Sequence, residues 1–395
     1  MSELSYLEKL LDGVEVEWKA VGDIAGYSTT KVDADKLDAT SFVGVDNLLA
    51  DKGGRIDATY QPNTARLTAY EPGDILLGNI RPYLKKVWMA ENNGGCSGDV
   101  LAIRILADCK KIISPEYLYY ALSSDSFFSY SMQHAKGAKM PRGSKDAILN
   151  YQIPIPCPSA PEKSLAIQSE IVRILDKFTA LTAELTAELT AELNMRKKQY
   201  NYYRDQLLSF KEGEVEWKTL GEVAQFKRGT AITQKQTTPG EIPVVANGPI
   251  PTYFHSESNR QGETIVIARS GAYAGYVSFW DQPIFLTDAF SVHSDLKIVK
   301  PKFIYHVLQN KQEHIHAMKK GAGVPHVRVK EFETYDIPIP PITEQERIVS
   351  ILDKFDTLTN SITEGLPREI ELRQKQYEYY RDLLFSFPKP ETVSK

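Results

Sequence analysis

The sequence predicts an α+β protein in which two globular mixed α/β blocks are separated by two long antiparallel helices, with a pseudo-two-fold internal repeat. The main observation is a repeated string: QYNYYRDQLLSF at residues 199–210 returns as QYEYYRDLLFSF at residues 376–387. A second string, IVRILDKF at 171–178, returns as IVSILDKF at 348–355, at the same offset of 177 residues. Because both matches share one offset, we expect two diverged copies of one unit.

Each copy is expected to contain a helix of roughly 45 residues, or about 65 to 70 Å at about 1.5 Å per residue. Apolar residues recur at steps of three or four, as on one face of a helix. They are Ile171, Ile174, Phe178, Leu181, Leu185, Leu189 and Leu193 in the first copy, and Ile348, Ile351, Phe355, Leu358, Ile362, Leu366 and Ile370 in the second. Two such stripes bury each other most simply as an antiparallel, coiled-coil-like pair. A kink is expected at Gly365-Leu366-Pro367.

The tetrapeptide TAEL occurs three times in tandem between Thr182 and Leu193. A leucine every four residues maintains the apolar stripe, so the addition or removal of one unit preserves the helix. One unit changes the length of the helix by about 6 Å and its rotation by about 40° beyond a full turn. The repeats are therefore predicted to act as a spacer ruler, whose residues are Thr182, Leu185, Thr186, Leu189, Thr190 and Leu193.

The blocks outside the helices have the pattern of mixed α+β domains. Short β-rich runs such as DILLGNI at 74–80 and ETIVIA at 263–268 alternate with turns rich in Gly, Asn and Pro. Each block contains one predicted helix with a proline in its first turn, starting at Ser114 and at Lys300. The predicted boundaries are 1–158 for the first block, 159–212 for the first long helix, 213–341 for the second block and 342–395 for the second long helix.

The composition gives no sign of a strongly charged, disulfide-rich or membrane protein. The net charge is −4, from 51 acidic and 47 basic residues, so any basic face is local. Cys96, Cys109 and Cys157 are too few and too irregularly spaced for a disulfide framework or a zinc site. The start lacks the pattern of a secretory signal, and no run approaches the roughly 20 apolar residues of a membrane span. We expect a cytoplasmic protein with no metal site and no membrane contact.

The sequence lacks the motifs of several catalytic classes. It contains no GxxxxGK phosphate-binding loop, and no Asp/Asn-Pro-Pro-aromatic tetrapeptide of the kind that amino-methyltransferases use. The triplets Glu17-Trp18-Lys19 and Glu216-Trp217-Lys218 resemble the E-x-K end of a nuclease motif, which needs a second acidic ligand for Mg²⁺. The more favoured interpretation is that each tryptophan anchors its block against the helices.

The residues that do cluster are cationic, and they lie on glycine-containing loops at matching places in the two blocks. Phosphates are bound by Arg and Lys, while base edges are read by Arg, Asn or Gln on loops that enter the major groove. A charged run is more often a solvated loop, so the recurrence carries this interpretation. The candidate DNA-binding residues of the first block are Asn79, Arg81, Tyr83, Lys85, Lys86, Lys136, Lys139, Arg142 and Lys145. Those of the second block are Lys227, Arg228, Arg269, Ser270, Tyr273, Lys319, Lys320, His326, Arg328 and Lys330. Core packing is the alternative for the two tyrosines.

Two variable blocks, two repeated helices and TAEL repeats in the central helix resemble the DNA-specificity subunit of type I restriction-modification enzymes, in particular the IC branch. The resemblance spans nearly the whole chain. It is most specific in EKSLAIQSEIVRILDKFTALTAEL from Glu162, RKKQYNYYRDQLLSFKEGEVEWKTLGE from Arg196 and PREIELRQKQYEYYRDLLFSFPKP from Pro367. It implies that each block is a target-recognition domain for one half of a split DNA sequence. The helices then hold the two domains apart, and three TAEL copies imply the longer spacer.

The same resemblance implies the partners and the division of labour. Two modification subunits dock on the helical parts and supply S-adenosylmethionine and the catalytic tetrapeptide, and restriction subunits that use ATP and Mg²⁺ join them in host defence. The chain itself is then a non-catalytic DNA-binding subunit without a cofactor of its own. Two other interpretations stay open: a stand-alone regulator that binds a bipartite operator, and a Mg²⁺-dependent nuclease that uses the E-x-K triplets.

Overall fold

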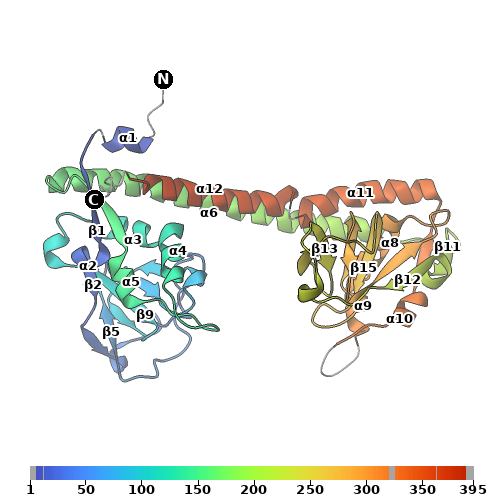
Figure 1. The fold of residues 1–395 in the computed structure, drawn as a ribbon, viewed down its shortest axis with the longest axis horizontal. Coiled ribbons are helices and arrows are strands. Elements are labelled where there is room, and N and C mark those ends of the chain that lie inside the picture. The colour runs from blue at the N-terminus through green and yellow to red at the C-terminus, as the bar shows by residue number, and fades with distance from the viewer. Residues whose placement is uncertain (1–5, 12, 320–324, 362, 388–395) are drawn as a thin grey trace. The chain divides into compact units, whose positions relative to one another are not determined.

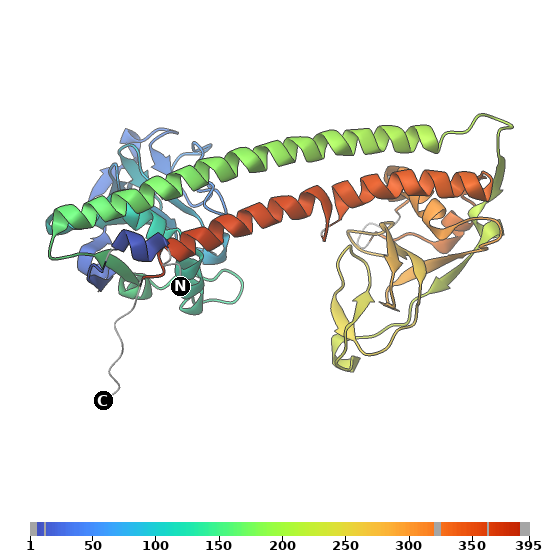
Figure 2. The same ribbon diagram turned by 90° about the horizontal axis from the view of Figure 1, so that it is seen from above.

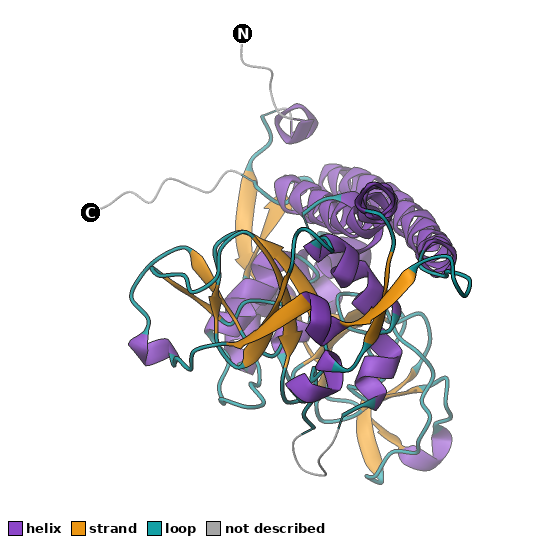
Figure 3. Ribbon diagram, turned by 90° about the vertical axis from the view of Figure 1, so that its right-hand side faces the viewer, coloured by secondary structure: helices purple, strands orange, loops and turns teal. Residues whose placement is uncertain are grey.

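The structure is a computed structural model that describes residues 6–11, 13–319, 325–361 and 363–387 (Figure 1). Helices and short strands are mixed throughout, as expected for the predicted α+β class (Figure 3). The chain divides into two compact units: unit 1 combines Met1–Ala187 with Glu371–Lys395, and unit 2 is Glu188–Ile370. Each unit therefore takes part of the first long helix and part of the C-terminal helical region.

Unit 1 contains two four-stranded sheets and one strand pair. The first sheet has the order β2 (Ala25–Tyr27), β9 (Val100–Ile105), β6 (Ile75–Gly78), β7 (Val87–Met89), with all pairs antiparallel. The second has the order β3 (Lys31–Asp33), β5 (Arg66–Tyr70), β8 (Gly94–Cys96), β4 (Phe42–Val43), and its last pair is parallel. Strand β1 (Val16–Ala20) pairs antiparallel with β10 (Gln152–Pro156), so the two ends of the block meet.

The helices of this block are short: α1 (Tyr6–Leu11), α2 (Val21–Ile24), α3 (Pro115–Leu122), α4 (Asp125–Gln133) and α5 (Lys145–Asn150). Helix α3 is the one predicted; the Ser114 hydroxyl caps it by accepting from the Tyr117 N–H. A second serine, Ser124, caps α4 in the same way through the Phe127 N–H. Since each cap satisfies an N–H group that would otherwise have no partner, the chain starts a new helix where one had been expected to end.

Unit 2 has a similar set of sheets. One sheet has the antiparallel order β12 (Ala224–Arg228), β18 (Ala289–Ser294), β15 (Glu263–Ala268), β16 (Val277–Asp281). A three-stranded sheet has the order β14 (Tyr253–His255), β13 (Ile242–Val245), β17 (Phe285–Leu286). Strand β11 (Glu216–Thr219) pairs antiparallel with β19 (Asp336–Ile339). The helices of this block are α7 (Leu220–Val223), α8 (Pro301–Asn310), α9 (Gln312–Ala317) and α10 (Val329–Glu333).

The first long helix, α6, runs unbroken from Pro161 to Leu207 (Figure 2). Its 47 residues confirm the predicted length. Ile171 and Leu175 are fully buried in the core of unit 1. Leu181, which was predicted to lie on the buried stripe, is 51% exposed. That prediction is wrong because the half-buried face passes through Phe178, Thr182 and Leu185, so Leu181 lies to one side of it.

The second helical region consists of two helices, α11 (Ile342–Asn360) and α12 (Gly365–Leu384), rather than one kinked helix. Gly365 has φ of +74°, and a Cβ there would lie 2.5 Å from the Thr357 carbonyl oxygen, so this position requires glycine. The chain therefore restarts a helix at Gly365 instead of bending through it. Ile362, a member of the predicted stripe, lies outside the described residues.

Within each unit, α6 contacts the C-terminal helical region through aromatic residues of the repeated strings. In unit 1, the Phe178 ring stacks on Tyr380 of α12, with centroids 5.3 Å apart. In unit 2, the Phe355 ring of α11 stacks on Tyr203, with centroids 5.6 Å apart. Phe178 and Phe355, and likewise Tyr203 and Tyr380, are 177 residues apart, so the two contacts use equivalent positions.

Candidate nucleic-acid interface

In unit 1, the turn that follows β6 is hydrogen-bonded to the loop between α4 and α5. The Arg81 N–H donates to the Pro141 carbonyl at 2.7 Å, and the Gly143 N–H donates to the Asn79 carbonyl at 2.9 Å. An isolated β-bridge lies between these two bonds. The two cationic loops of the first block therefore lie together.

In unit 2, the turn that follows β15 is joined in the same way to the loop before α10. The Gly271 N–H donates to the Pro325 carbonyl at 2.9 Å, and the Val327 N–H donates to the Arg269 carbonyl at 3.0 Å. An isolated β-bridge again lies between the two bonds. Both units thus build one pattern, in which a turn at the end of a central strand is tied to a late loop that contains a proline.

The turn in unit 1 has an unusual backbone. Arg81 and Lys85 flank the 3₁₀ turn Pro82–Leu84 with φ values of 53° and 49°. Left-handed φ values are uncommon for residues other than glycine, and they persist where neighbouring structure holds them; such positions are enriched at functional sites. The turn therefore has a defined backbone conformation that neighbouring structure holds in place.

The predicted side chains of unit 1 fall into two groups. The exposed ones are Arg81, Tyr83, Lys136, Lys139, Arg142 and Lys145, and Arg142 also pairs with Asp99 at 2.9 Å. The others are held by the protein. Lys85 Nζ lies 2.8 Å from Asp125, and Lys86 Nζ donates to the Val45 carbonyl. Asn79 is 8% exposed, so its side chain is poorly placed to reach a base edge.

In unit 2, the strand register places the predicted residues at one end of the main sheet. Arg228 pairs with Phe290, which pairs with Ile267, so the end of β12 is level with the end of β15 that leads to Arg269. The exposed predicted residues are Lys227, Arg228, Tyr273, Arg328 and Lys330, and the half-buried ones are Arg269, Ser270, Lys319 and His326. Lys319 Nζ donates to the Ala272 carbonyl. Lys320 lies outside the described residues.

Two residues that the sequence did not single out organise this end of unit 2. Asp288 accepts from Arg269 at 2.6 Å and from Ser270 at 2.8 Å. Asn247 donates to Asp288 and accepts from the N–H groups of Arg269 and Ser270. Burial alone would raise the pKa of Asp288, but bonds from Asn247, Ser270 and Arg269 keep it below its ordinary value. Asn247-Gly248 is a turn dipeptide, but nothing in the sequence links it to Arg269.

The E-x-K triplets lie on strands, and the Glu and Lys of each triplet form an ion pair with each other. Glu17 and Lys19 on β1 form an ion pair at 2.9 Å, and Glu216 and Lys218 on β11 form one at 3.2 Å. Across the described ranges there is no group of three or more His, Cys, Asp or Glu side chains that could hold a metal ion. Trp18 packs against the core of unit 1, as expected for an anchor.

Each unit also has a hollow beside its strand pair. Hollow 1, in unit 1, has a volume of about 650 Å³, and hollow 2, in unit 2, about 320 Å³. Their linings match through the repeats: Trp18 with Trp217, Tyr151 with Tyr335, Pro154 with Pro338, Asp382 with Asp205, Phe385 with Leu208, Ser386 with Ser209 and Phe387 with Phe210. Trp217 is 48% exposed, so the anchoring role predicted for this tryptophan is wrong; its ring forms part of the wall of hollow 2.

The aspartate of hollow 1 has an unsatisfied carboxylate oxygen. Asp382 Oδ1 is buried and has no hydrogen-bond partner among the described residues. Burial and the charges of Asp125 and Glu378 raise its pKa. A buried polar atom without a partner is uncommon in folded proteins.

No helix in the described part of the chain is long and apolar enough to cross a membrane.

Comparison with known proteins gives a consistent result. The family model described as type I restriction modification DNA specificity domain matches residues 72–195 and 212–372. The chain is 44% identical to the type I restriction enzyme EcoR124I/EcoR124II specificity subunit of Escherichia coli, over 100% of both chains. It is 37% identical to the EcoprrI specificity subunit of E. coli, over 92% of this chain and 93% of that one.

Solved structures of low sequence identity share the fold. One solved chain comes from a structural study of complex assembly and conformational transition of the type I R-M system. It is 18% identical, with a TM-score of 0.63 over 94% of this chain and 97% of that one. The S subunit of a type I system from M. genitalium is 17% identical, with a TM-score of 0.51 over 96% and 98%. Together with the family match over most of its length, the 44% identity places this chain in the family of type I restriction-modification specificity subunits, which give the DNA sequence specificity of their enzymes.

Proposed function

We propose that this subunit reads a bipartite DNA target, with one half-site recognised by each unit. The observation that carries this proposal is the shared pattern of joined loops. In both units, two backbone hydrogen bonds tie the turn after a central strand to a proline-containing late loop. Exposed basic side chains accompany both pairs of loops. A duplicated surface of this kind suits two stretches of one duplex.

Within each pair of loops, the residues divide by the contact each can make. Lys136, Lys139 and Lys145 in unit 1, and Lys227 and Lys330 in unit 2, are exposed point charges suited to phosphates. Arg81 and Arg269 carry planar guanidinium groups suited to bidentate contacts with guanine. Asp288 holds the Arg269 guanidinium at 2.6 Å, which preorganises it for such a contact.

The helices set the distance between the two half-sites. We assign a pseudo-two-fold internal repeat to the chain. We also assign an antiparallel, coiled-coil-like pairing of α6 with the C-terminal helices. Equivalent aromatic stacks, Phe178 on Tyr380 and Phe355 on Tyr203, support this assignment. The TAEL repeats lie inside the uninterrupted α6, so their number sets the spacer, as in the IC branch. The recognition domains are then 1–158 and 213–341, joined by helical segments 159–212 and 342–395.

The partners are two modification subunits, one at each hollow. The matched linings support two copies of one partner, because a Trp, a Pro and an Asp at corresponding sequence positions line a hollow in each unit. Asp382 and Asp205 give each hollow a carboxylate residue suited to a basic side chain from that partner. In the cytoplasm, the modification subunits supply S-adenosylmethionine and the catalysis, and restriction subunits supply the ATP- and Mg²⁺-dependent steps. This chain itself catalyses no reaction.

The first experiment separates this function from its alternatives. The purified chain is incubated with a DNA library, alone and then with its modification subunit and S-adenosylmethionine. We expect neither cleavage nor methylation from the chain alone, and adenine methylation at one bipartite sequence from the mixture. Tight specific binding by the chain alone, with no methylation in the mixture, would favour the stand-alone regulator. Mg²⁺-dependent cleavage lost in Glu17→Ala with Glu216→Ala would favour the nuclease.

A second experiment tests the docking sites by native mass spectrometry. Asp382→Lys and Asp205→Lys should each leave one modification subunit bound instead of two, and the double variant none. Asp108→Lys, which changes an exposed aspartate outside both hollows, should leave two bound. Two subunits bound to the double variant would show that the hollows are not the docking sites.

A further inference from the structure

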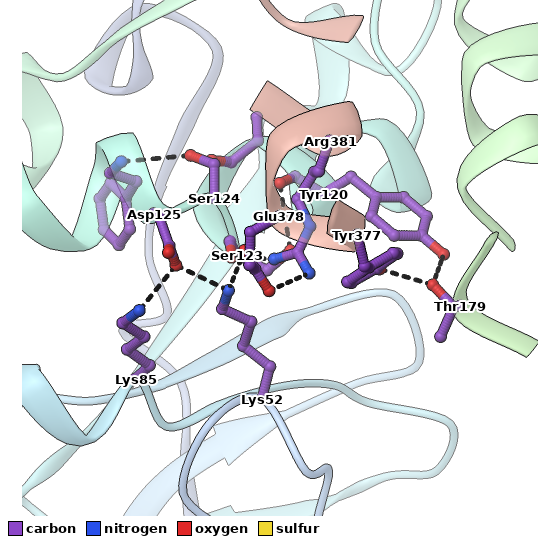
Figure 4. Close-up of polar contacts among 12 residues, drawn as sticks. Lys52, Lys85, Tyr120, Ser123, Ser124, Asp125, Thr179, Tyr377, Glu378 and Arg381 are labelled. Atoms are coloured by element: carbon purple, nitrogen blue, oxygen red, sulfur yellow. Dashed lines mark hydrogen bonds and ion pairs between the residues drawn. The ribbon is translucent and has the colours of Figure 1, made fainter. Parts of the chain in front are cut away.

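A buried lysine in unit 1 connects the loop between β4 and β5 to helix α12. Lys52 Nζ lies 2.6 Å from Glu378 Oε2 on α12 and 2.8 Å from Asp125 Oδ1 at the start of α4 (Figure 4). Its side chain is only 8% exposed, so it cannot serve as a surface phosphate contact. Asp51 and Lys52 both have left-handed φ values, of 51° and 63°. This loop is therefore held in a conformation that its two carboxylate partners help to fix.

The same loop supports the strained turn that carries Arg81. The Asp51 N–H donates to the Leu84 carbonyl and the Lys52 N–H to the Lys85 carbonyl, both at 2.9 Å. The side chains converge as well, since Lys85 Nζ lies 2.8 Å from the Asp125 oxygen that Lys52 binds (Figure 4). Two backbone hydrogen bonds and one shared carboxylate thus connect Asp51 and Lys52 to residues 81–86.

On the other side, the contacts continue into the long helices. Glu378 accepts from Arg381 at 3.0 Å, and Arg381 donates to the Ser123 carbonyl (Figure 4). The Arg381 guanidinium lies 4.5 Å from the centroid of the Tyr377 ring, and the Tyr377 hydroxyl is hydrogen-bonded to Thr179 of α6. A continuous set of polar contacts therefore runs from both long helices to the turn after β6.

No equivalent connection is found among the residues of unit 2 that the structure describes. The residue 177 positions before Glu378 is Asn201, and the partner of Arg381 by the same offset is Arg204. Arg204 contacts Asn310 and Asn201, both neutral. Both units therefore have the arginine. Among the described residues, the lysine with its two carboxylate partners occurs in unit 1 only. Because the contact is peculiar to one unit, it is not simply part of the shared helix-docking arrangement.

We infer that Lys52 is a positioning residue: it fixes the turn at residues 81–86 against helix α12, so that accurate reading of the half-site bound by unit 1 depends on a lysine that does not touch DNA. This inference rests on the proposed function, in which each unit reads one half-site. Removal of the lysine charge leaves Asp125 and Glu378 facing each other without the cation that they share. The turn keeps its two backbone hydrogen bonds and the Lys85–Asp125 pair, but it loses the side-chain link to α12. Arg81 would then sample several orientations, and a wrong base would be rejected less well.

The test measures discrimination in each half-site separately. The complex of the full chain with its modification subunit methylates DNA libraries in which single bases of either half-site are varied. Arg81→Ala first identifies the half-site that unit 1 reads. Lys52→Met should reduce discrimination between correct and mismatched bases by about tenfold in that half-site only. Lys52→Arg, which retains the positive charge, should retain the discrimination of the wild type. Lys36→Met is the matched control: Lys36 is a 69% exposed lysine of the same unit, with an ion pair to Asp33.

A second variant covers the case in which Lys52→Met does not fold. Glu378→Gln keeps the shape of the side chain and removes one of the two charges, so it should relax the same half-site more weakly. Unchanged discrimination in both variants, or an equal loss in both half-sites, would overturn the inference. Failure of the proposed function would look different, because the wild-type complex would then show no bipartite methylation at all.

Discussion

Deletion of one TAEL unit, residues 190–193, should shorten the spacer of the target and leave both half-sites unchanged. Helix α6 is continuous over 47 residues, so the deletion removes four residues from a rod without an interruption. At about 1.5 Å and 100° per residue, this is about 6 Å of length and about 40° of rotation beyond a full turn. Leu185 and Leu189 keep their spacing, so the half-buried face of the helix is preserved.

The expected change in the DNA follows from the geometry of the duplex. One base pair of B-DNA contributes about 3.4 Å of rise and about 35° of rotation. The loss of about 6 Å corresponds to roughly two base pairs by rise, and about 40° corresponds to roughly one by rotation. We therefore expect a spacer shorter by one or two base pairs. The assay is sequencing of all methylated sites in cells that express the variant with its partner subunits.

A two-residue deletion, of 192–193, is the matched control for the ruler. It rotates the part of the helix after residue 193 by about 160° relative to the part before it, which moves the buried Tyr200 to the opposite side. This variant should lose methylation altogether, whereas deletion of four residues should keep it. New bases within a half-site, or an unchanged spacer after the four-residue deletion, would refute the reasoning.

Three further predictions concern the folded chain. Burial raises the pKa of the Cys96 thiol to about 12, so a thiol reagent should modify half-buried Cys109 in the native protein and reach Cys96 only after unfolding. Burial would raise the pKa of Asp125, but bonds from Lys52 and Lys85 lower it to about 2 from 3.8. The resulting stability is present above pH 4 and lost as the pH falls toward 2, and Asp125→Asn should remove this dependence from acid unfolding curves. Ile348→Ala, at a fully buried position, should lower the free energy of unfolding by about 2–5 kcal/mol. The control Leu181→Ala, at an exposed position, should lower it by less than about 1 kcal/mol. Denaturant titration measures both values.

The sequence predicted the features that depend on local patterns. The repeated strings and the spacing of apolar residues predicted a helix of roughly 45 residues, and α6 has 47. The serine and proline at 114–115 predicted the start of α3. These signals act over one or two helical turns, so they can be read without knowledge of the fold.

The features that were missed depend on contacts between distant residues. Asn247 and Asp288 are separated by 41 positions and meet around Arg269 only because β13 and β17 bring them to one end of unit 2. Lys52 meets Glu378 across 326 positions. At Gly365, where the helix restarts, a Cβ would lie 2.5 Å from the Thr357 carbonyl oxygen and 2.7 Å from that of Leu358. None of these contacts leaves a periodic pattern in the sequence.

The central claim is that each unit reads its own half of one target. The most direct measurement replaces residues 20–155 with the corresponding block of another family member and sequences the methylated sites in cells with the partner subunits. We expect one half-site to be exchanged for that of the donor, with the second half-site unchanged. A change in both half-sites, or in neither, would contradict the claim.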